Sequence, residues 1–179
     1  MAKASDVAKL MIEIANSNPN EDLMTNLRLN KLLYFAQVGS LKRLGYLLIE
    51  DEFEAWKFGP VVKQIYDSYK MHGRNGIPTA PCNREFLTRE EQLYIIDVVR
   101  TFSPKSTSTL VSDSHLSGGP WEKAYSSNEI IISKDYIKDY DNKAIEIKPF
   151  KSKFKETDFI GHRNESNVLV LPKELDYAE

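Results

Sequence analysis

The chain has 179 residues, of which 41% are apolar and 28% charged, and its 24 basic and 26 acidic residues leave a formal net charge of −2. This composition is typical of one soluble globular domain, and a chain of this length buries about two thirds of the surface that it exposes when unfolded. The single cysteine, Cys82, excludes an internal disulfide and a cysteine-rich zinc module, and it indicates a reducing compartment. No run approaches the roughly 18 apolar residues of a membrane span, and no apolar signal core follows Met1. We therefore expect a cytoplasmic protein without a membrane partner.

Two helices are predicted near the start of the chain. Apolar residues at a spacing of three and four predict a helix that is capped by Ser5 or Asp6 and ends near Asn16. A second helix is predicted from about residue 25 to residue 42. It carries more apolar residues than a single stripe needs, so we expect it to be the central helix.

Residues 46–58 have a different pattern, in which large apolar residues alternate with charged ones over part of the segment. This period of two predicts two short strands or an extended arm. Gly59 permits a sharp turn, and Pro60 suits the first position of a helix that we expect to end near Met71. The glycines and prolines of residues 73–82 predict a mobile loop.

The clearest helix signal in the second half is the capping box of Thr88 and Glu91, which predicts a helix that ends before Pro104. Three shorter helices are predicted after it: one from a Ser106 cap to His115, one that starts at Trp121, and one from a Ser133 cap to about Tyr140.

The predicted fold class is mainly α, a compact multi-helix domain with a small β component near residues 46–58 and in the C-terminal tail. In the tail, residues 144–147 and 167–171 read as short strands, and their pattern leaves open whether they pair as a hairpin or dock separately. We expect a helical domain over residues 1–140 and a C-terminal extension over residues 141–179.

The extension holds one basic run. Residues 143–155 contain five lysines and one glutamate, a local balance of +4. We expect this run to bind a partner through Lys148, Lys151, Lys153 and Lys155.

No pattern in the sequence indicates an active site. The three histidines, His72, His115 and His162, have no metal-ligand spacing. Asp113, Ser114 and His115 are adjacent, whereas the members of a catalytic triad converge from separate elements. No nucleotide-binding loop is present. We therefore expect a protein that is not an enzyme, with no cofactor and no metal, and we rank last a metal-dependent nuclease that would use Glu54.

Aromatic residues are more numerous than a core of this size needs, and aromatic side chains are enriched at protein interfaces. We nevertheless expect Trp56 and Trp121 to be core residues with hydrogen-bonded indoles. His115 is expected to be a buried group with hydrogen bonds.

Three motifs in chain order carry a resemblance: Leu-Asn-Lys-Leu-Leu-Tyr-Phe-Ala-Gln at 29–37, Phe-Glu-Ala-Trp-Lys-Phe-Gly-Pro-Val-Val at 53–62, and His115 followed by Pro120 and Trp121. Over about residues 4–140 the chain resembles the Panacea domain family of SocA-like antitoxins, which includes phage-associated proteins. Asn30 departs from the glutamine that is more usual in that family. The family-motif residues, which we expect to be structural, are Lys31, Leu32, Tyr34, Ala55, Trp56, Gly59, Pro60, Val61, His115, Pro120 and Trp121.

The resemblance implies a helical antitoxin that neutralises a toxin by direct contact and has no enzymatic activity. One branch of the family delivers its toxin to an ATP-dependent protease, so such a protease is a further expected partner. We expect the toxin to contact the loop at residues 73–82 and the tail after Tyr140, because recognition is commonly carried by loops on a rigid frame.

The alternative hypothesis is a DNA-binding transcriptional regulator of a prophage or of its own operon, based on short helices and the basic run at residues 143–155. The near-neutral net charge argues against it, so no nucleic-acid partner is expected.

Overall fold

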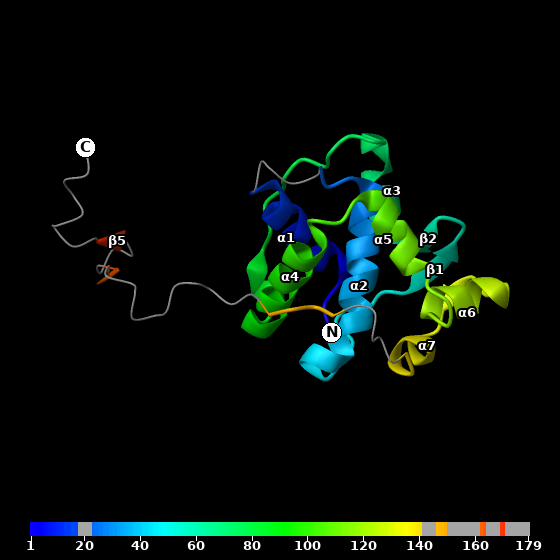
Figure 1. Ribbon diagram of the computed structural model, residues 1–179. Helices are drawn as coiled ribbons and strands as arrows, with labels where there is room; N and C mark the ends of the chain where they lie inside the picture. The colour runs from blue at the N-terminus through cyan, green and yellow to red at the C-terminus, as the bar shows by residue number, and fades with distance from the viewer. Residues whose placement is uncertain (18–22, 141–145, 150–161, 164–168, 171–179) are drawn as a thin grey trace. The chain divides into compact units, whose positions relative to one another are not determined.

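Helix α2 (Asn26–Leu44) is the central element of the computed structural model (Figure 1). Thr25 caps its N-terminus by accepting a hydrogen bond from the backbone N–H of Arg28, and Gly45 ends it in a left-handed conformation with φ of 79°. Buried side chains lie on every face of the helix, so other elements must surround it. The prediction of a central second helix is therefore confirmed.

The structure describes residues 1–17, 23–140, 146–149, 162–163 and 169–170. The chain divides into two units, Met1–Pro149 and Phe150–Glu179. The first unit is mainly helical with a small antiparallel sheet, as predicted. Among the helices of the described residues, none combines the length and the apolar character that a bilayer crossing needs.

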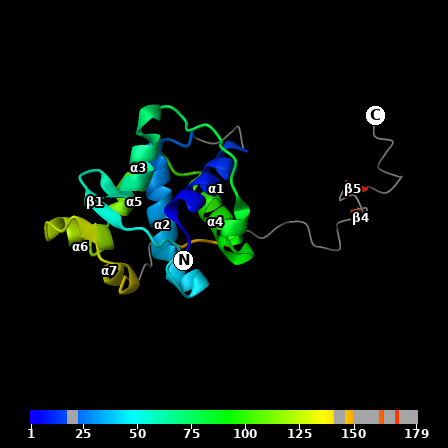
Figure 2. The same cartoon turned by 180° about the vertical axis from the view of Figure 1, so that it is seen from behind.

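The elements around α2 form two groups, which Figures 1 and 2 show on opposite sides of it. One side holds α1 (Ala4–Asn16) and α4 (Arg89–Phe102), which both pack on α2. The other side holds the strands and the shorter helices α5 (Thr107–Ser114), α6 (Pro120–Ser126) and α7 (Lys134–Lys138).

The sheet of the first unit has the strand order β2-β1-β3, with β1 at Phe53–Trp56, β2 at Gly59–Val61 and β3 at Ile131–Ile132. Strand β1 pairs antiparallel with both neighbours. The β component near residues 46–58 is confirmed, but residues 46–49 form no strand. Ile49 makes only an isolated parallel bridge with Ala2.

The predicted helix start at Pro60 is wrong. Pro60 lies in β2 opposite Ala55, and the helix that follows, α3, spans Lys63–Tyr69 before the 3-10 turn η1 at Lys70–His72. Gly59 has φ of +99°, which turns the chain back into a hairpin. Proline is tolerated in β2 because this is an edge strand.

The predicted caps in the second half are confirmed. Thr88 accepts from the N–H of Glu91, and the Glu91 carboxylate accepts from the N–H of Thr88 at 2.8 Å. Ser106 and Ser133 cap α5 and α7 by accepting from the backbone N–H groups of Thr109 and Asp135, without the reciprocal bond of a capping box. Between the 3-10 turns η1 and η2 (Arg84–Phe86), residues 73–83 form no helix or strand.

The predicted cap of the first helix is wrong, because Lys3 and not Ser5 or Asp6 stands at the N-cap position. The N–H of Ala4 donates to the Asp51 carboxylate at 2.7 Å. A residue distant in sequence therefore accepts a hydrogen bond from the first backbone N–H of α1.

The described part of the tail contains one strand pair. In the second unit, β4 (His162–Arg163) and β5 (Leu169–Val170) pair antiparallel, so the predicted strand at 167–171 is present in part. Residues 146 and 147 are in no strand, and residues 144 and 145 lie outside the described ranges. Ile147 instead packs on the core of the first unit, close to Gly39 and Tyr94.

Candidate functional site

The β1–β2 hairpin lies against α2 and brings distant parts of the sequence together. Its strands pair Glu54 with Val61 and Trp56 with Gly59, which leaves Lys57 and Phe58 as a two-residue turn. The carbonyl of Pro60 accepts a hydrogen bond from the Lys31 ammonium at 2.9 Å. The first two family motifs therefore meet at this hairpin.

Lys31 has no solvent exposure, and its amine donates a hydrogen bond to the Pro60 carbonyl. Burial lowers the pKa of the Lys31 amine from 10.5 to about 7, because a charged group is costly in a low-dielectric interior. No ion pair with a carboxylate offsets this cost within the described residues. The Lys31 amine therefore loses its proton at a lower pH than an exposed lysine does.

Gly59 makes this arrangement possible. A Cβ at this position would lie 2.8 Å from Lys31 Nζ and 2.8 Å from Ser114 Oγ, closer than real Cβ contacts. Any other residue would also be strained at a φ of +99°. The turn therefore needs glycine for conformation and for space.

The third motif packs on β1, the middle strand of the sheet. Trp121 Nε1 donates to the Trp56 carbonyl at 3.0 Å, and the Trp121 ring lies 3.8 Å from that of His115. Burial, followed by the nearby charge of Lys31, lowers the pKa of His115. Its Nε2 is buried and has no hydrogen-bond partner among the described residues, in contrast to the hydrogen-bonded histidine expected from the sequence.

The family-motif residues are thus gathered around one hairpin, and most of them are buried: Lys31, Leu32, Tyr34, Gly59, Pro60, Val61, Pro120 and Trp121. Trp121 is 8% exposed, as expected of a core residue. Trp56 is only half-buried, so the expectation of a core position is met in part. Its indole N–H donates to the Glu54 carboxylate at 2.6 Å.

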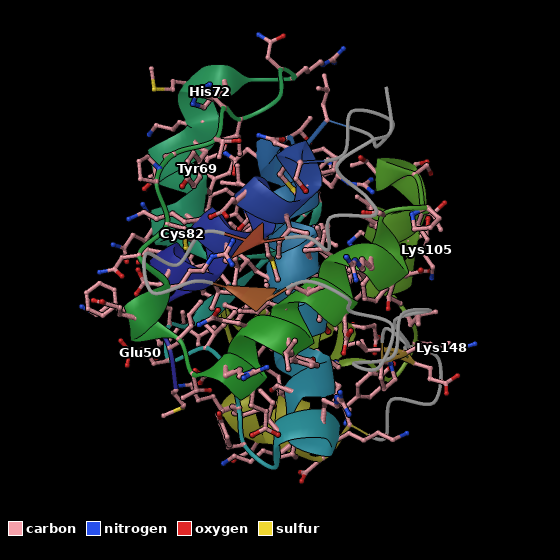
Figure 3. All side chains as sticks on the ribbon, turned by 90° about the vertical axis from the view of Figure 1, so that its left-hand side faces the viewer. Glu50, Tyr69, His72, Cys82, Lys105 and Lys148 are labelled. Carbon is pink, nitrogen blue, oxygen red and sulfur yellow. The ribbon has the colours of Figure 1, made fainter. Side chains whose placement is uncertain are left out.

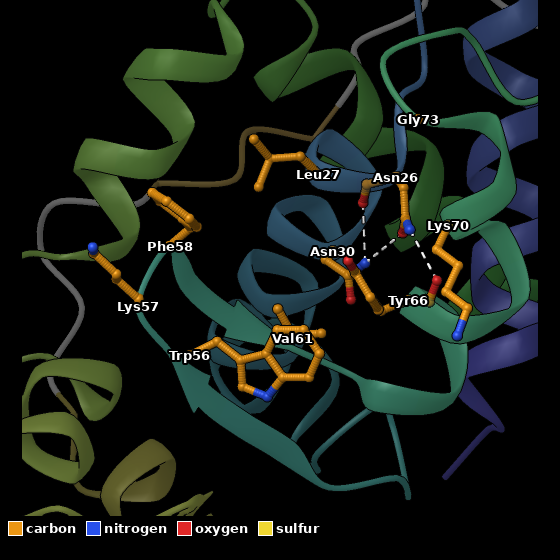
Figure 4. A pocket seen from close by; sticks show the side chains of 10 residues that line it. All are labelled: Asn26, Leu27, Asn30, Trp56, Lys57, Phe58, Val61, Tyr66, Lys70 and Gly73. Atoms are coloured by element: carbon orange, nitrogen blue, oxygen red, sulfur yellow. Dashed lines mark hydrogen bonds between the residues drawn. The ribbon is translucent and has the colours of Figure 1, made fainter.

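In front of the hairpin is a groove of about 450 Å³, which we call the hairpin groove (Figure 4). The Trp56 ring lines it and meets Tyr66 edge-on at a centroid distance of 4.9 Å. Leu27 and Phe58 also line it, and both are exposed. The remaining lining residues are Asn26, Asn30, Lys57, Val61, Lys70 and Gly73.

The side-chain amides of the groove hold elements together. Asn26 Nδ2 donates to the Tyr66 carbonyl at 2.9 Å, and Asn30 Nδ2 donates to Asn26. Asn30 Oδ1 accepts from the Val62 N–H at 3.0 Å, which joins α2 to the start of α3. The asparagine that departs from the usual family pattern is thus part of this hydrogen-bonded network.

Sequence reasoning did not identify the groove. Tyr66 belongs to the aromatic surplus, but Leu27 and Lys70 have no local signal, because only folding brings α2 and η1 together.

Asp113 and Ser114, which the sequence does not assign to a catalytic triad, have structural partners. The Asp113 carboxylate accepts from Lys105 at 2.7 Å, and Ser114 Oγ donates to the Val111 carbonyl, so neither contacts His115 in the manner of a triad. In the described ranges no group of three or more histidine, cysteine, aspartate and glutamate residues is arranged to hold a metal.

The basic run is described only at its start. Lys148 is exposed and extends away from the ribbon in Figure 3, with its Nζ 4.0 Å from the Glu146 carboxylate. Lys151, Lys153 and Lys155 lie outside the described residues.

Comparison with known proteins gives two matches. The family described as "Antitoxin SocA-like, Panacea domain" matches residues 29–122, which include every family-motif residue but form a shorter span than residues 4–140. The protein "Antitoxin SocA" of Caulobacter vibrioides is 36% identical over 110 residues, which cover 55% of this chain and 58% of that protein. No solved structure matches the chain. The chain belongs to the family of SocA-like antitoxins with a Panacea domain.

Proposed function

We propose that this chain is the antitoxin of a toxin–antitoxin pair and neutralises its toxin by direct protein–protein contact. The observation that carries the proposal is the match of residues 29–122 to the SocA-like antitoxin family. The exposed aromatic surface near the hairpin supports it, because aromatic side chains are enriched at protein interfaces. The proposal requires no catalytic step and no cofactor.

In this proposal the helical domain of residues 1–140 is the scaffold, and the family-motif residues hold its hairpin in place. The buried Lys31–Pro60 and Trp121–Trp56 hydrogen bonds support a structural role for them. The partner-specific contacts come from the loop at residues 73–82 and from the extension at 141–179.

The four lysines of the basic run are proposed toxin contacts. Reversing the charge of Lys148, Lys151, Lys153 and Lys155 to glutamate in the full chain should weaken toxin binding, and more so at low salt because exposed charges are screened by salt. Reversing Lys42, an exposed lysine of α2, is the matched control.

Neutralisation has two proposed routes: occlusion of the toxin, or its delivery to an ATP-dependent protease. The half-life of the toxin in cells distinguishes them. Occlusion leaves the half-life unchanged or longer when this chain is present, whereas delivery shortens it and requires the protease.

Growth of a bacterial host tests the proposal itself. The product of the adjacent gene is expressed alone and together with this chain, and the two products are then copurified. Growth arrest that this chain relieves, with coelution of the pair, is the expected result. A harmless neighbour and no copurification contradict the proposal, and a mobility shift on the upstream DNA then tests the DNA-binding alternative.

A further inference from the structure

The hairpin groove is an unusual surface because large apolar side chains surround a cavity and remain in contact with solvent. Phe58 is 67% exposed, and Leu27 and Tyr66 are 41% and 36% exposed. Scattered exposed apolar residues are ordinary, but a cluster around a concave site marks a binding surface. The volume of about 450 Å³ lies in the range of ligand sites and suits a few side chains.

The polar groups of the groove already have partners in the protein. The amides of Asn26 and Asn30 bond to the backbone and to each other, and the Trp56 indole N–H bonds to Glu54. A ligand therefore gains little from hydrogen bonds to these groups and most from apolar contact with Trp56 and its neighbours. The core of the ligand must be apolar.

The charges at the rim indicate what flanks that core. Figure 4 shows Lys57 and Lys70 at opposite ends of the groove. Asp67 pairs with both Lys63 and Lys70, at 2.6 and 3.0 Å, so one carboxylate is shared by two ammonium groups. Lys57 has no ion pair with a described carboxylate and lies over the Phe58 ring, with Nζ 5.8 Å from its centroid. The lining itself holds two lysines, Lys57 and Lys70. When the neighbouring Lys63, Asp67 and Glu54 are counted as well, three lysines and two carboxylates give a balance of +1.

We propose that the hairpin groove is the docking site for a segment of the toxin that carries large apolar side chains flanked on both sides by carboxylates. The apolar side chains enter the groove between Trp56, Phe58 and Leu27, and the carboxylates meet Lys57 and Lys70. The identity of the partner as the toxin rests on the proposed function, whereas the preference for an apolar and acidic segment rests on the groove alone.

Peptide binding tests the groove independently of the toxin. An array of synthetic 12-residue peptides is prepared with two central residues drawn from Trp, Phe, Leu and Ile, flanked on both sides by Asp and Glu, by Ser, or by Lys. Fluorescence anisotropy with the full chain should show that the best acidic peptides bind at least tenfold more tightly than the best lysine peptides. Equal binding of the three sets, or binding of none, overturns the proposal.

Two variants and two matched controls test whether the peptides bind in the hairpin groove. Phe58→Ser and Lys57→Glu should each weaken binding of the best acidic peptide about tenfold or more. Phe86→Ser changes a phenylalanine that is equally exposed, at 66%, but lies in η2 away from the groove, and Lys42→Glu changes an exposed lysine of α2. If the controls weaken binding as much as the groove variants do, the peptides do not bind in the groove.

The same four variants are then tested in the growth assay, where they separate the two proposals. Relief of toxicity by the wild type and by Phe86→Ser, but not by Phe58→Ser, is expected. Relief by Phe58→Ser as well contradicts docking of the toxin in the groove and leaves the antitoxin function supported. Failure of the wild type to relieve toxicity contradicts the antitoxin function, while the peptide result still decides what the groove prefers.

Discussion

At the residue scale, the lysine behind the hairpin makes the stability of the fold depend on pH. In the folded chain the pKa of Lys31 is about 7, whereas the unfolded value is 10.5. Between these values the unfolded chain binds a proton that the folded chain does not, so stability rises with pH, by at most about 1.4 kcal/mol per unit. Below pH 7 both states are protonated, and Lys31 adds no slope.

Urea unfolding from about pH 7 to pH 9 measures this slope, and Lys31→Met should reduce it by about 1 kcal/mol per pH unit. Lys42→Met removes an exposed lysine and is the control, with an unchanged slope expected. Equal slopes in the wild type and in Lys31→Met would show that Lys31 titrates normally in the fold.

Gly59 is a second residue whose substitution should change the unfolding free energy by a predictable amount. Gly59→Ala combines strain at a positive φ with overlap against Lys31 and Ser114, and should cost about 3 kcal/mol of unfolding free energy. Gly45→Ala has a similar φ of +79° but no atom within 4 Å of the added Cβ, so it should cost only about 1 to 2 kcal/mol. A cost for Gly59→Ala no greater than that for Gly45→Ala would mean that Lys31 and Ser114 move aside freely.

At the scale of elements, a buried arginine joins α2 to the end of α4. The Arg28 guanidinium donates to the carbonyls of Phe102, Ser103 and Lys105 at 3.3, 3.0 and 2.9 Å. These carbonyls lie at and just beyond the C-terminus of α4, so the guanidinium gives a buried cluster of carbonyls a donor and its charge opposes the helix dipole. Arg28→Met should therefore destabilise the fold by about 3 kcal/mol in chemical denaturation. Arg74→Met, at an exposed loop position, should change stability by less than about 0.5 kcal/mol.

The two tryptophans that join the hairpin to α6 should have different roles. Trp121→Ala removes a buried ring, its stacking on Tyr125 and its bond to the Trp56 carbonyl, and should cost about 3 to 5 kcal/mol. Trp56→Ala removes a half-buried ring, so about 1 to 2 kcal/mol is expected together with a loss of peptide binding in the groove. Thermal or urea unfolding of both variants checks the order, and an equal loss would assign Trp56 to the core.

At the scale of the whole molecule, local sequence signals predict most of the helices. They do not predict the features that depend on pairing between residues distant in sequence. The capping box of Thr88 and Glu91 needs only neighbours in sequence, and it was predicted correctly. The sequence predicts a helix start at Pro60, whereas Pro60 pairs with Ala55 in the sheet. This pairing depends on the positive φ of Gly59, which a sequence does not show. The family motifs identified the residues at the hairpin, but the burial of Lys31 and the groove in front of Trp56 arise only when α2, the hairpin and α3 pack together.

The two units of the chain lead to an expectation for truncation. Ile147 packs close to Gly39 and Tyr94, so a chain cut after Tyr140 loses an apolar contact of the first unit, whereas one cut after Pro149 keeps it. Both truncations should lose toxin neutralisation if the extension at 141–179 supplies contacts. The chain that ends at Pro149 should unfold at the higher temperature, and calorimetry of the two truncated chains measures the difference. Full neutralisation by the chain that ends at Tyr140 contradicts a role of the extension, and full neutralisation by the chain that ends at Pro149 contradicts a role of residues 150–179.

The most direct measurement of the proposed function is a titration of the purified chain with the purified product of the adjacent gene, followed by calorimetry and by size-exclusion chromatography of the mixture. A saturable interaction with a defined stoichiometry and coelution of the two proteins is the predicted result, and Phe58→Ser should weaken it while Phe86→Ser does not. Absence of heat and of coelution at micromolar concentrations, with both proteins folded, would contradict neutralisation by direct contact.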